Sequence, residues 1–412
     1  MLLKKRASGR VQRLPDPPMS VARKLQVQGV PGMARRTRHG HRVPVHFPFP
    51  KNTAMRSPRH LLTPLAVALG CASALATAHA ADPMKVGFLY IGPASGAGWS
   101  YAHELARQEV QKKFGNKIET IFVENVAEND AERVTRDLAA QGAKVIFGGA
   151  FGFMNGMERV SRDFPKVAFE HATGYKTGPN LGIYDIRTYE GACLNGTIAG
   201  HLSKTQTIGV VAPHPIPEIV RNINAFTLCA QEVNPKIQTR ILWVNTWYDP
   251  PKEAEAAKTL LNQGVDVLMQ NTDSAAPLQV AKEAGKVGFG WDTDMAQWGG
   301  DAQMAAARLD WSIYYSKVVA DVMAGTWKPG NVWIGMQDGA IHYDHFSKNL
   351  PAKVRAAVEQ RGKDIVSGKR PVFHGPLRDQ AGKERSKAGD MPDADKLKMN
   401  FLVQGVIGAM PQ

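Results

Sequence analysis

The chain has 412 residues, enough for two ordinary domains with extensions, and carries a formal net charge of +14. Most of that charge lies at one end. Residues 1–80 contain 14 Lys and Arg and a single acid, whereas residues 81–412 contain 37 Lys and Arg against 36 acids. A folded part so close to neutrality lacks the basic surface that binds polyanions, so we expect no nucleic-acid partner.

Residues 55–80 have the three parts of a secretory signal peptide. A short basic start precedes an apolar run from Leu61, and the segment ends in Ala-His-Ala at 78–80. The apolar run is short and rich in alanine, unlike a membrane span. We therefore expect cleavage after Ala80 and export to the periplasm as a soluble protein.

Two alternatives concern this leader. Cys71 would mark a lipoprotein, but residues 68–70 form a poor lipobox and the signal continues to a better cleavage site, so lipid anchoring is the weaker interpretation. Residues 1–54 are rich in Arg and Pro and precede a complete signal with its own Met55. We interpret them as an over-extended reading frame, with a disordered basic arm as the alternative. We predict the fold from residues 81–412 alone.

The stretch at 85–104 organises the rest of the chain. A short apolar run at 86–91 has the composition of a buried parallel strand, and a loop rich in small residues leads from it into a helical pattern carrying Trp99. Open α/β sheets bind ligands beyond the carboxyl ends of their strands. Trp99 then either faces a ligand or packs under the first helix as a core residue. Both interpretations stay open at this stage.

Short apolar strands alternate with amphipathic helices along the rest of the chain. This alternation predicts parallel sheets with right-handed crossovers. The pattern restarts at Thr207, so we predict two doubly wound domains of similar build with a cleft between them. The strands are expected at 86–91, 118–125, 144–149, 166–172 and 181–186 in the first half and at 208–212, 238–245, 265–271 and 287–291 in the second.

The last part of the chain completes this arrangement. We expect a long helix at about 310–324, a strand within 331–343, a helix at 350–368, an extended segment at 372–380, a loop at 380–393 and a final apolar helix at 401–407. The predicted domain organisation is an N-terminal lobe at 84–205, a C-terminal lobe at 206–325, and segments at 326–412 that cross between the lobes and complete them.

Aromatic and polar residues gather directly after successive strands in both halves. These strand ends converge on one rim of each sheet, which makes their repeated position more informative than any single cluster. Aromatic rings with a few carboxylates and amides suit a small, flat solute with a polar edge. The clusters are Trp99 with Tyr101, Phe151 with Phe153, Glu170 with His171, Trp247 with Tyr248, Asn271 to Asp273, and Trp291 with Asp292.

Structural roles compete with binding roles for several of these residues. Glu170 and His171 could be an acid/base pair, but a solvated or hydrogen-bonded strand end is favoured. Glu253 and Glu255 are interpreted as the solvated face of a helix. The stripe Trp311, Tyr314 and Tyr315 has helical spacing and is interpreted as packing, with Asp310 as a cap.

No motif for catalysis is present. The loop GPASGAG lacks the G-x-G-x-x-G spacing, and neither G-x-S-x-G nor a Walker sequence occurs. Cys193 and Cys229 have no adjacent basic partner; we expect two buried free thiols, with a disulfide as the alternative. No His/Cys cluster has ligand spacing, so we expect no metal, no cofactor and no enzymatic activity.

Several ordered segments together resemble one protein family. KVGFLYIGP, GAGWSYAHE, FGGAFGFMN, FEHATGYK, YEGACLNGTIAGHL, VNTWYDPPKEAEAAKTLLNQGVDVLMQNTDS and GFGWDTDM are similar to the basic membrane protein family, the solute-binding proteins of certain ABC importers. The similarity spans 84–412. It implies a type I periplasmic-binding-protein fold, with two Rossmann-like domains, three crossover strands and hinge closure on a purine nucleobase or nucleoside.

The resemblance also implies roles for individual residues. Trp99 replaces the stacking phenylalanine of the nucleoside binders, Ser100 stands where they have a ligand-contacting Asn, and Asp292 matches an aspartate that holds ribose. The segment TDSAAP replaces their glycine-rich loop and places Asp273 there, which shrinks the expected site and favours a free base such as adenine. The implied ligand-binding set is Trp99, Ser100, Tyr101, Phe151, Glu170, Trp247, Asn271, Asp273 and Asp292.

The favoured function is therefore a monomeric periplasmic binding protein that delivers a purine-type solute to an ABC permease in the inner membrane. A ligand-sensing module of the same fold that signals to a membrane receptor is the alternative. A nucleoside-processing enzyme is the least favoured, because no nucleophile or metal motif supports it.

Overall fold

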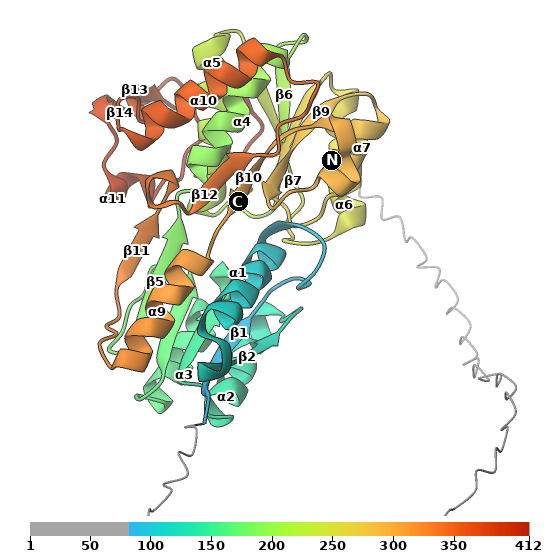
Figure 1. Cartoon of the computed structure of the whole chain (residues 1–412). Coiled ribbons are helices and arrows are strands. Elements are labelled where there is room, and N and C mark those ends of the chain that lie inside the picture. The colour runs from blue at the N-terminus through green and yellow to red at the C-terminus, as the bar shows by residue number, and fades with distance from the viewer. Residues whose placement is uncertain (1–81, 412) are drawn as a thin grey trace, which may run out of the picture. The chain divides into compact units, whose positions relative to one another are not determined.

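The computed structural model describes residues 82–411, which form two α/β lobes (Figure 1). The first lobe is built on a six-stranded, wholly parallel sheet of order β11-β5-β4-β3-β1-β2. Its strands are β1 (Met84–Leu89), β2 (Ile118–Val123), β3 (Val145–Gly148), β4 (Ala168–Ala172), β5 (Leu181–Ile186) and β11 (Asn331–Ile334). The predicted signal peptide, Cys71 and residues 1–54 lie outside the described residues.

The second lobe is built on a seven-stranded sheet of order β12-β10-β9-β8-β6-β7-β15, parallel except for β12. Its strands are β6 (Thr207–Ala212), β7 (Gln238–Trp243), β8 (Val267–Gln270), β9 (Val287–Asp292), β10 (Gln303–Leu309), β12 (Ile341–Asp344) and β15 (Val406–Ile407). The helices of the two lobes are α1 (Gly98–Phe114), α2 (Ala131–Ala140), α3 (Met154–Asp163), α4 (Tyr189–Leu202), α5 (Pro217–Val233), α6 (Pro250–Asn262), α7 (Ala276–Glu283), α8 (Ala296–Gly299), α9 (Ser312–Ala324), α10 (Ala352–Val366) and α11 (Asp393–Lys396).

The chain passes between the lobes three times, after β5, after β10 and after β11. As a result α4 packs on α5 in the second lobe, and α9 lies beside α1 in the first (Figure 1). The close approach of α4 and α5 depends on glycine. A Cβ on Gly196 would lie 2.2 Å from the carbonyl oxygen of Phe226, and one on Gly200 would lie 2.6 Å from that of Ala230. The predicted lobe ranges differ from this arrangement by one helix each: α4 falls within 84–205 and α9 within 206–325.

The first-lobe core is rich in aromatic residues. Trp311 and Tyr315 are fully buried, and the ring of Tyr315 lies 4.2 Å from that of Phe147. Tyr314 is also buried, and the Asp310 carboxylate accepts a hydrogen bond from the backbone N–H of Ser312 at 2.9 Å. The structure thus confirms that this stripe packs, whereas the N-cap of α9 is Trp311 and Asp310 lies one residue before it.

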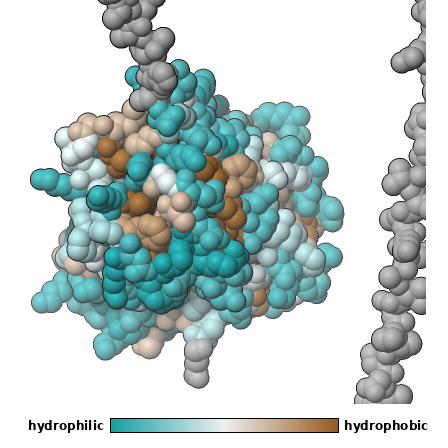
Figure 2. All heavy atoms as spheres, turned by 90° about the horizontal axis from the view of Figure 1, so that it is seen from below, coloured by the Kyte–Doolittle hydropathy of each residue, from teal (hydrophilic) through white to brown (hydrophobic). Residues whose placement is uncertain are grey.

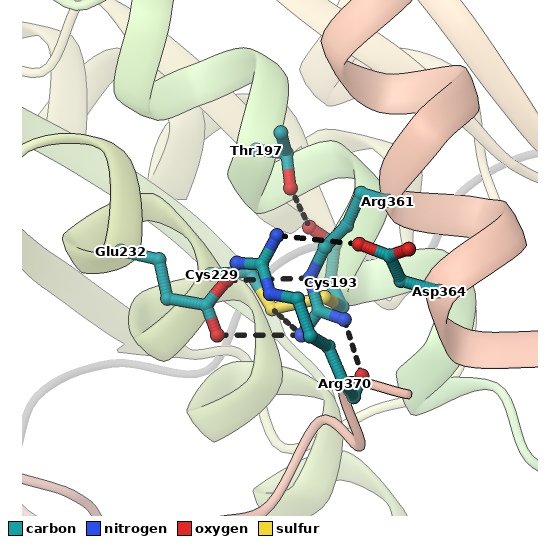
Figure 3. Close-up of a disulfide and its surroundings, with 7 residues drawn as sticks. All are labelled: Cys193, Thr197, Cys229, Glu232, Arg361, Asp364 and Arg370. Atoms are coloured by element: carbon teal, nitrogen blue, oxygen red, sulfur yellow. Dashed lines mark hydrogen bonds and ion pairs between the residues drawn. A yellow bond between two sulfur atoms is a disulfide. The ribbon is translucent and has the colours of Figure 1, made fainter. Parts of the chain in front are cut away.

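Cys193 and Cys229 form a disulfide that joins α4 to α5, so the expectation of two free thiols is wrong (Figure 3). The sequence gives no sign of the pairing, because it depends on the close packing of these helices, which brings the two Cα atoms to 5.2 Å. Arg361 of α10 covers the bond and donates to Cys229 Sγ at 3.6 Å.

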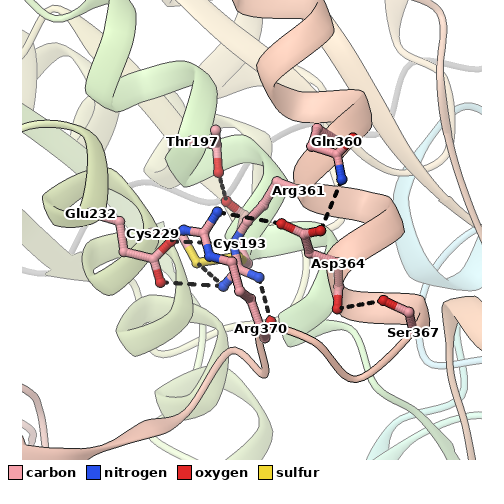
Figure 4. Close-up of polar contacts among 9 residues, drawn as sticks. All are labelled: Cys193, Thr197, Cys229, Glu232, Gln360, Arg361, Asp364, Ser367 and Arg370. Carbon is pink, nitrogen blue, oxygen red and sulfur yellow. Dashed lines mark hydrogen bonds and ion pairs between the residues drawn. A yellow bond between two sulfur atoms is a disulfide. The ribbon is translucent and has the colours of Figure 1, made fainter.

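Ion pairs surround the disulfide (Figure 4). Glu232 accepts from Arg370 at 2.6 Å and pairs with Arg361, which also donates to the carbonyl oxygen of Arg370. Asp364 is held by Gln360 Nε2 at 2.9 Å and pairs with Arg370. The side chain of Arg361 is 2 % exposed, so its charge depends on these partners.

The C-terminal tail differs from its prediction. Residues expected as an extended segment and a loop form an antiparallel hairpin of β13 (His374–Arg378) and β14 (Glu384–Asp390). The apolar segment at 401–407 is not a helix. Its backbone groups form hydrogen bonds with other parts of the chain: Asn224 donates to the carbonyl oxygen of Phe401 and accepts from the N–H of Val403. β15 then pairs with β7 as the edge strand of the second sheet.

The surface seen in Figure 2 is mostly hydrophilic, with smaller hydrophobic areas between the polar side chains. Among residues 82–411, no helix has the length and apolar character needed to span a membrane.

Candidate functional site

A small pocket lies between the carboxyl ends of the two sheets. Its free volume is about 30 Å³, and a buried water needs roughly 10–15 Å³, so the pocket is small. Six of the nine residues in the predicted binding set line it. The lining comprises Ile91, Trp99, Ala150, Phe151 and Thr173 of the first lobe and Ile216, Glu218, Ile219, Trp247, Asn271, Asp273, Trp291 and Asp292 of the second.

The first lobe supplies aromatic surface. Trp99 lies in the first turn of α1, where its Nε1 donates to the carbonyl oxygen of Gly149 at 2.6 Å. Its ring meets those of Trp311 and His103 edge to face, at 5.1 and 5.0 Å. One side of the ring packs on the core and the ring also lines the pocket, so its contact with a ligand stays a prediction. Phe151 follows β3 in a short 3₁₀ turn, Phe151–Phe153, and lines the pocket beside it.

The side chain of His103 supports this wall from behind. The ring stacks on Trp311 at 4.5 Å, and Nδ1 lies 2.5 Å from the Tyr315 hydroxyl. Complete burial lowers the pKa of His103 to about 3, so the imidazole is neutral at physiological pH. The neutral ring acts as packing for the indole of Trp99.

The second lobe supplies carboxyl groups. Asp292 ends β9 with a φ of 61°, and its Oδ1 is buried without a hydrogen-bond partner among the described residues. Burial raises its pKa well above the usual value, and the nearby charges of Asp273 and Glu218 add to the effect. Burial raises the pKa of Asp273 to about 7 and also raises that of Glu218. A ligand that donates hydrogen bonds or carries positive charge would stabilise the ionised acids.

Contacts between the lobes close the pocket; we call the set of Gly98, Ser100, Asp273 and Thr293 the interlobe seam. The N–H of Gly98 donates to Thr293 Oγ1 at 3.0 Å, and Ser100 Oγ donates to Asp273 Oδ2 at 3.4 Å. The backbone N–H groups at the start of α1 also favour the Asp273 carboxylate and oppose the rise in its pKa. Gly98 has a φ of +80°, and a Cβ on it would lie 2.3 Å from the carbonyl oxygen of Asp273.

A further interlobe contact lies beside the pocket. Trp247 Nε1 donates to Glu128 Oε1 at 3.2 Å, and the Trp247 ring lies 4.9 Å from that of His214. This tryptophan thus both lines the pocket and bridges the lobes.

Three residues of the predicted set lie outside the pocket lining. Ser100 is buried in the interlobe seam, and Tyr101 is half-buried farther along α1.

Glu170 lies inside the first lobe, where it accepts from Tyr314 Oη at 2.9 Å and Trp327 Nε1 at 2.8 Å. Successive side chains of β4 point to opposite faces of the sheet. Glu170 points to the face that α9 covers, and therefore not into the pocket. Its burial raises its pKa to about 7. The hydrogen-bonded interpretation of Glu170 fits this geometry.

The sequence interpretation missed two acids. Glu218 lies in the first turn of α5, where an acid is already explained by the helix dipole, so nothing marked it as a pocket residue. Glu253 is fully buried, not solvated as expected: it accepts from Ser274 Oγ at 2.5 Å and from the Asp249 N–H at 2.9 Å. It holds the loop that carries Asp273. Glu255 is exposed, as predicted.

Within the described part of the chain, no group of three or more His, Cys, Asp or Glu residues could hold a metal ion. The residues that line the pocket provide aromatic rings from both lobes and, from the second lobe, carboxyl and amide groups. This combination can hold a flat molecule between rings and accept hydrogen bonds from its edge.

Comparison with known proteins identifies the family of this chain. The model of the family described as "ABC transporter substrate-binding protein PnrA-like" matches residues 84–371. A purine-binding protein of Brucella abortus is 45 % identical over 337 residues, which is 81 % of this chain and 96 % of the relative. A putative ABC transporter glucose-binding protein of Haloferax volcanii is 35 % identical over 330 residues, 80 % of this chain and 82 % of the relative.

A solved structure agrees in fold. The crystal structure of an ABC transporter solute-binding protein from Aeropyrum pernix superposes with a TM-score of 0.61 at 16 % identity, covering 72 % of this chain and 93 % of that one. The family resemblance and the two-lobed α/β fold expected from the sequence are confirmed.

Proposed function

The chain belongs to the PnrA-like family of ABC transporter substrate-binding proteins, and from that premise we propose that it binds a purine-type base in its interlobe pocket. Members of this family are solute-binding proteins rather than enzymes. We further propose that the protein works in the periplasm as a monomer and delivers its ligand to a permease of the inner membrane.

The observation that carries the proposal is the pairing of aromatic and acidic walls in one closed pocket. Trp99 and Phe151 offer ring faces, and stacking on a base contributes roughly 1–3 kcal/mol. Asp292 and Asn271 each hold a buried oxygen without a partner among residues 82–411. A purine presents N–H donors along its edge, which suit these acceptors.

The size of the pocket favours a compact ligand. We expect the lobes to separate when the base enters and to close on it again, because the free volume of the pocket is only about 30 Å³. The two curated relatives above are named for different solutes, a purine and glucose. The aromatic walls favour the flat heterocycle, because a planar ring can stack face to face on the ring of Trp99.

Calorimetric titration tests the proposal. Residues 81–412, unfolded and refolded to remove any carried ligand, are titrated in turn with adenine, guanine and glucose. Tight binding of a purine base, weakened in Trp99→Ala, would support the proposal and the stacking role together. Tight binding of glucose without response to the purines would overturn it.

The delivery step needs a separate test. Uptake of labelled adenine by cells lacking the gene is compared with uptake by cells carrying the wild-type gene. Loss of saturable uptake at low concentration, restored by the wild-type gene but not by a Trp99→Ala copy, supports delivery to a permease. Uptake that does not depend on the gene would contradict it.

A further inference from the structure

Glu253, in the first turn of α6, is a fully buried acid that lies outside the pocket lining. Its side chain contacts two separate loops. Oε1 accepts from the backbone N–H of Asp249 at 2.9 Å, and Oε2 accepts from the backbone N–H and the hydroxyl group of Ser274 at 3.2 and 2.5 Å. Three donors on two oxygens are the pattern of a carboxylate, which accepts hydrogen bonds and does not donate them.

Each of these loops carries a residue of the pocket. Trp247 lies two positions before Asp249, and Asp273 directly precedes Ser274. The loops also contact each other, since the N–H of Asp273 donates to the carbonyl oxygen of Trp247 at 3.1 Å. Glu253 therefore fixes, from the interior of the lobe, two loops whose neighbouring residues line the pocket.

The contact with Ser274 is more than a helix cap. The hydroxyl oxygen of Ser274 accepts from the N–H of Ala276 at the start of α7 at 3.2 Å, and its carbonyl oxygen accepts from the buried side chain of Gln270. Capping of α6 explains the bond from Asp249 to Glu253. It does not explain the bonds from Ser274, which lies 21 positions farther along the chain. These bonds connect Glu253 to the loop of Asp273.

Glu253 also places a negative charge beside Asp273. Burial is the main cause that raises the pKa of Asp273 to about 7, and the charge of Glu253 is the next. The N–H groups at the start of α1 and the hydroxyl group of Ser100 oppose this rise. Asp292 on β9 and Glu218 on α5 also interact with Asp273 as like charges. Of these three acids, Glu253 alone lies outside the pocket lining.

We propose that Glu253 is a positioning residue for ligand binding, which holds the loops of Trp247 and Asp273 together and keeps a negative charge beside the Asp273 carboxyl group. This inference rests on the proposed function, because it takes the base in the pocket as given. A base that donates an N–H to Asp273 favours the ionised acid, so binding releases a proton from Asp273. Without the charge of Glu253, more of Asp273 is ionised before the ligand arrives, and fewer protons are released.

Calorimetric titration of the refolded wild type and of Glu253→Gln with adenine and with guanine tests the proposal. Titrations at pH 6.5 in buffers of different ionisation enthalpy give the number of protons released, and titrations at pH 8, where Asp273 is largely ionised, compare the affinities. Glutamine keeps the length of the side chain and one acceptor oxygen but carries no charge. The matched control is Glu255→Gln, which changes an exposed acid two positions along the same helix.

We expect Glu253→Gln to bind the base about 3- to 10-fold more weakly at pH 8, the size of one hydrogen bond. The protons released at pH 6.5 should fall by about 0.5 per ligand, the change expected for an Asp273 pKa lower by about one pH unit. Glu255→Gln should match the wild type in both measurements.

Ser274→Ala separates the two roles of Glu253. This variant removes the hydroxyl bond to Glu253 and leaves the charge in place. Affinity at pH 8 should therefore fall about 3-fold or more, while the number of protons released at pH 6.5 stays that of the wild type. The same variant gives the measurement of loop positioning if thermal unfolding shows Glu253→Gln to be destabilised.

Several outcomes would overturn the inference. These are wild-type affinity and proton release in Glu253→Gln, equal losses in Glu255→Gln, or a loss of thermal stability in Glu253→Gln with wild-type proton release, which would reduce Glu253 to a structural residue. Failure of the wild type to bind either base would instead count against the proposed function. Hydrogen exchange of the Asp249 and Ser274 amides in the ligand-free protein still tests the contacts in that case, with roughly 10-fold faster exchange expected in Glu253→Gln.

Discussion

The two lobes share one architecture but present unlike surfaces to the pocket between them. Among the described lining residues, the first lobe contributes Ile91, Trp99, Ala150, Phe151 and Thr173, none of which is charged. The second contributes Glu218, Asp273 and Asp292. The first half thus offers only uncharged side chains, whereas the second adds these carboxyl groups to rings of its own, Trp247 and Trp291. The Asp273 carboxylate accepts hydrogen bonds from groups at the start of α1 in the first lobe. Closure of the lobes therefore provides partners for one of the acids.

The lobes also differ in covalent support. Of the three cysteines in the sequence, two form the bond between α4 and α5 in the second lobe, and Cys71 lies outside the described residues. The acidic residues therefore lie on a cross-linked support, whereas Trp99 of the first lobe is held by packing and by its hydrogen bond to Gly149.

Removal of the disulfide should have the largest effect, on stability. The bond links residues 36 positions apart, and a loop of this size is worth about 3–4 kcal/mol in the unfolded-chain entropy model. We expect the double variant Cys193→Ser, Cys229→Ser to lose roughly this much in urea unfolding. Ligand affinity should stay unchanged, because neither cysteine lines the pocket. A loss below about 1 kcal/mol would contradict the cross-link's stabilising role.

Gly98→Ala should have the largest effect on binding, because a methyl group at 2.3 Å from the Asp273 carbonyl oxygen holds the interlobe seam apart. We expect ligand affinity to fall about 100-fold, or about 2.7 kcal/mol, in calorimetry. Gly96→Ala is the matched control: it has a similar positive φ of +97° but no neighbour within 4 Å of the added carbon. Equal losses in the two variants would show that backbone strain, and not the seam, is responsible.

Trp99→Ala removes the main ring of the aromatic wall. Loss of one stacked base is worth about 1–3 kcal/mol, so we expect affinity for a purine base to fall roughly 10- to 100-fold. Trp99→Phe keeps a ring and loses the bond to Gly149, and should bind within a few-fold of the wild type. A Phe variant as weak as the Ala variant would argue against stacking.

Asp292→Asn tests the acidic wall with a smaller expected effect. The amide keeps one acceptor but replaces the other with a donor, so we expect about a 10-fold loss of purine affinity. Asp301→Asn, an exposed acid of the same lobe, should bind as the wild type does. An Asp292→Asn protein with wild-type affinity would remove this residue from the proposed site.

The last prediction concerns pH. The pKa of Asp273 is raised from 3.8 to about 7, so the folded state holds a proton that the unfolded chain releases above about pH 4. The stability it contributes is complete below pH 4 and is lost as the pH rises to 7, by at most about 1.4 kcal/mol per pH unit. The melting temperature of the ligand-free wild type, relative to that of Asp273→Asn, should fall across this range. A constant difference would contradict the raised pKa.

Much of the fold could be predicted from local patterns. The continuous apolar runs of β3, β6 and β9 identify buried parallel strands without any knowledge of their neighbours. β15 could not be predicted, because two residues carry no periodicity and their pairing with β7 depends on Asn224 holding the preceding segment. The disulfide escaped prediction for the same reason, since it depends on how two helices pack.

The acids of the candidate site also differ in how well the sequence predicts their position. Asp273 lies shortly after β8 and Asp292 ends β9, so their position in a parallel sheet predicts that they reach its edge. Glu218 and Glu253 lie in helices, where an acid near the start has an ordinary explanation. What places Glu253 in the interior is Ser274, 21 positions away, and that contact exists only after folding.

The three passages of the chain between the lobes have a consequence for its synthesis. Five strands of the first sheet are complete by residue 186, but the sixth, β11, is made only at 331–334, after most of the second lobe. Until then the edge of β5 has no neighbouring strand, and an unpaired edge invites association with other chains. We therefore expect a chain that stops between these points to aggregate, and the span from β1 to β15 to fold as one unit.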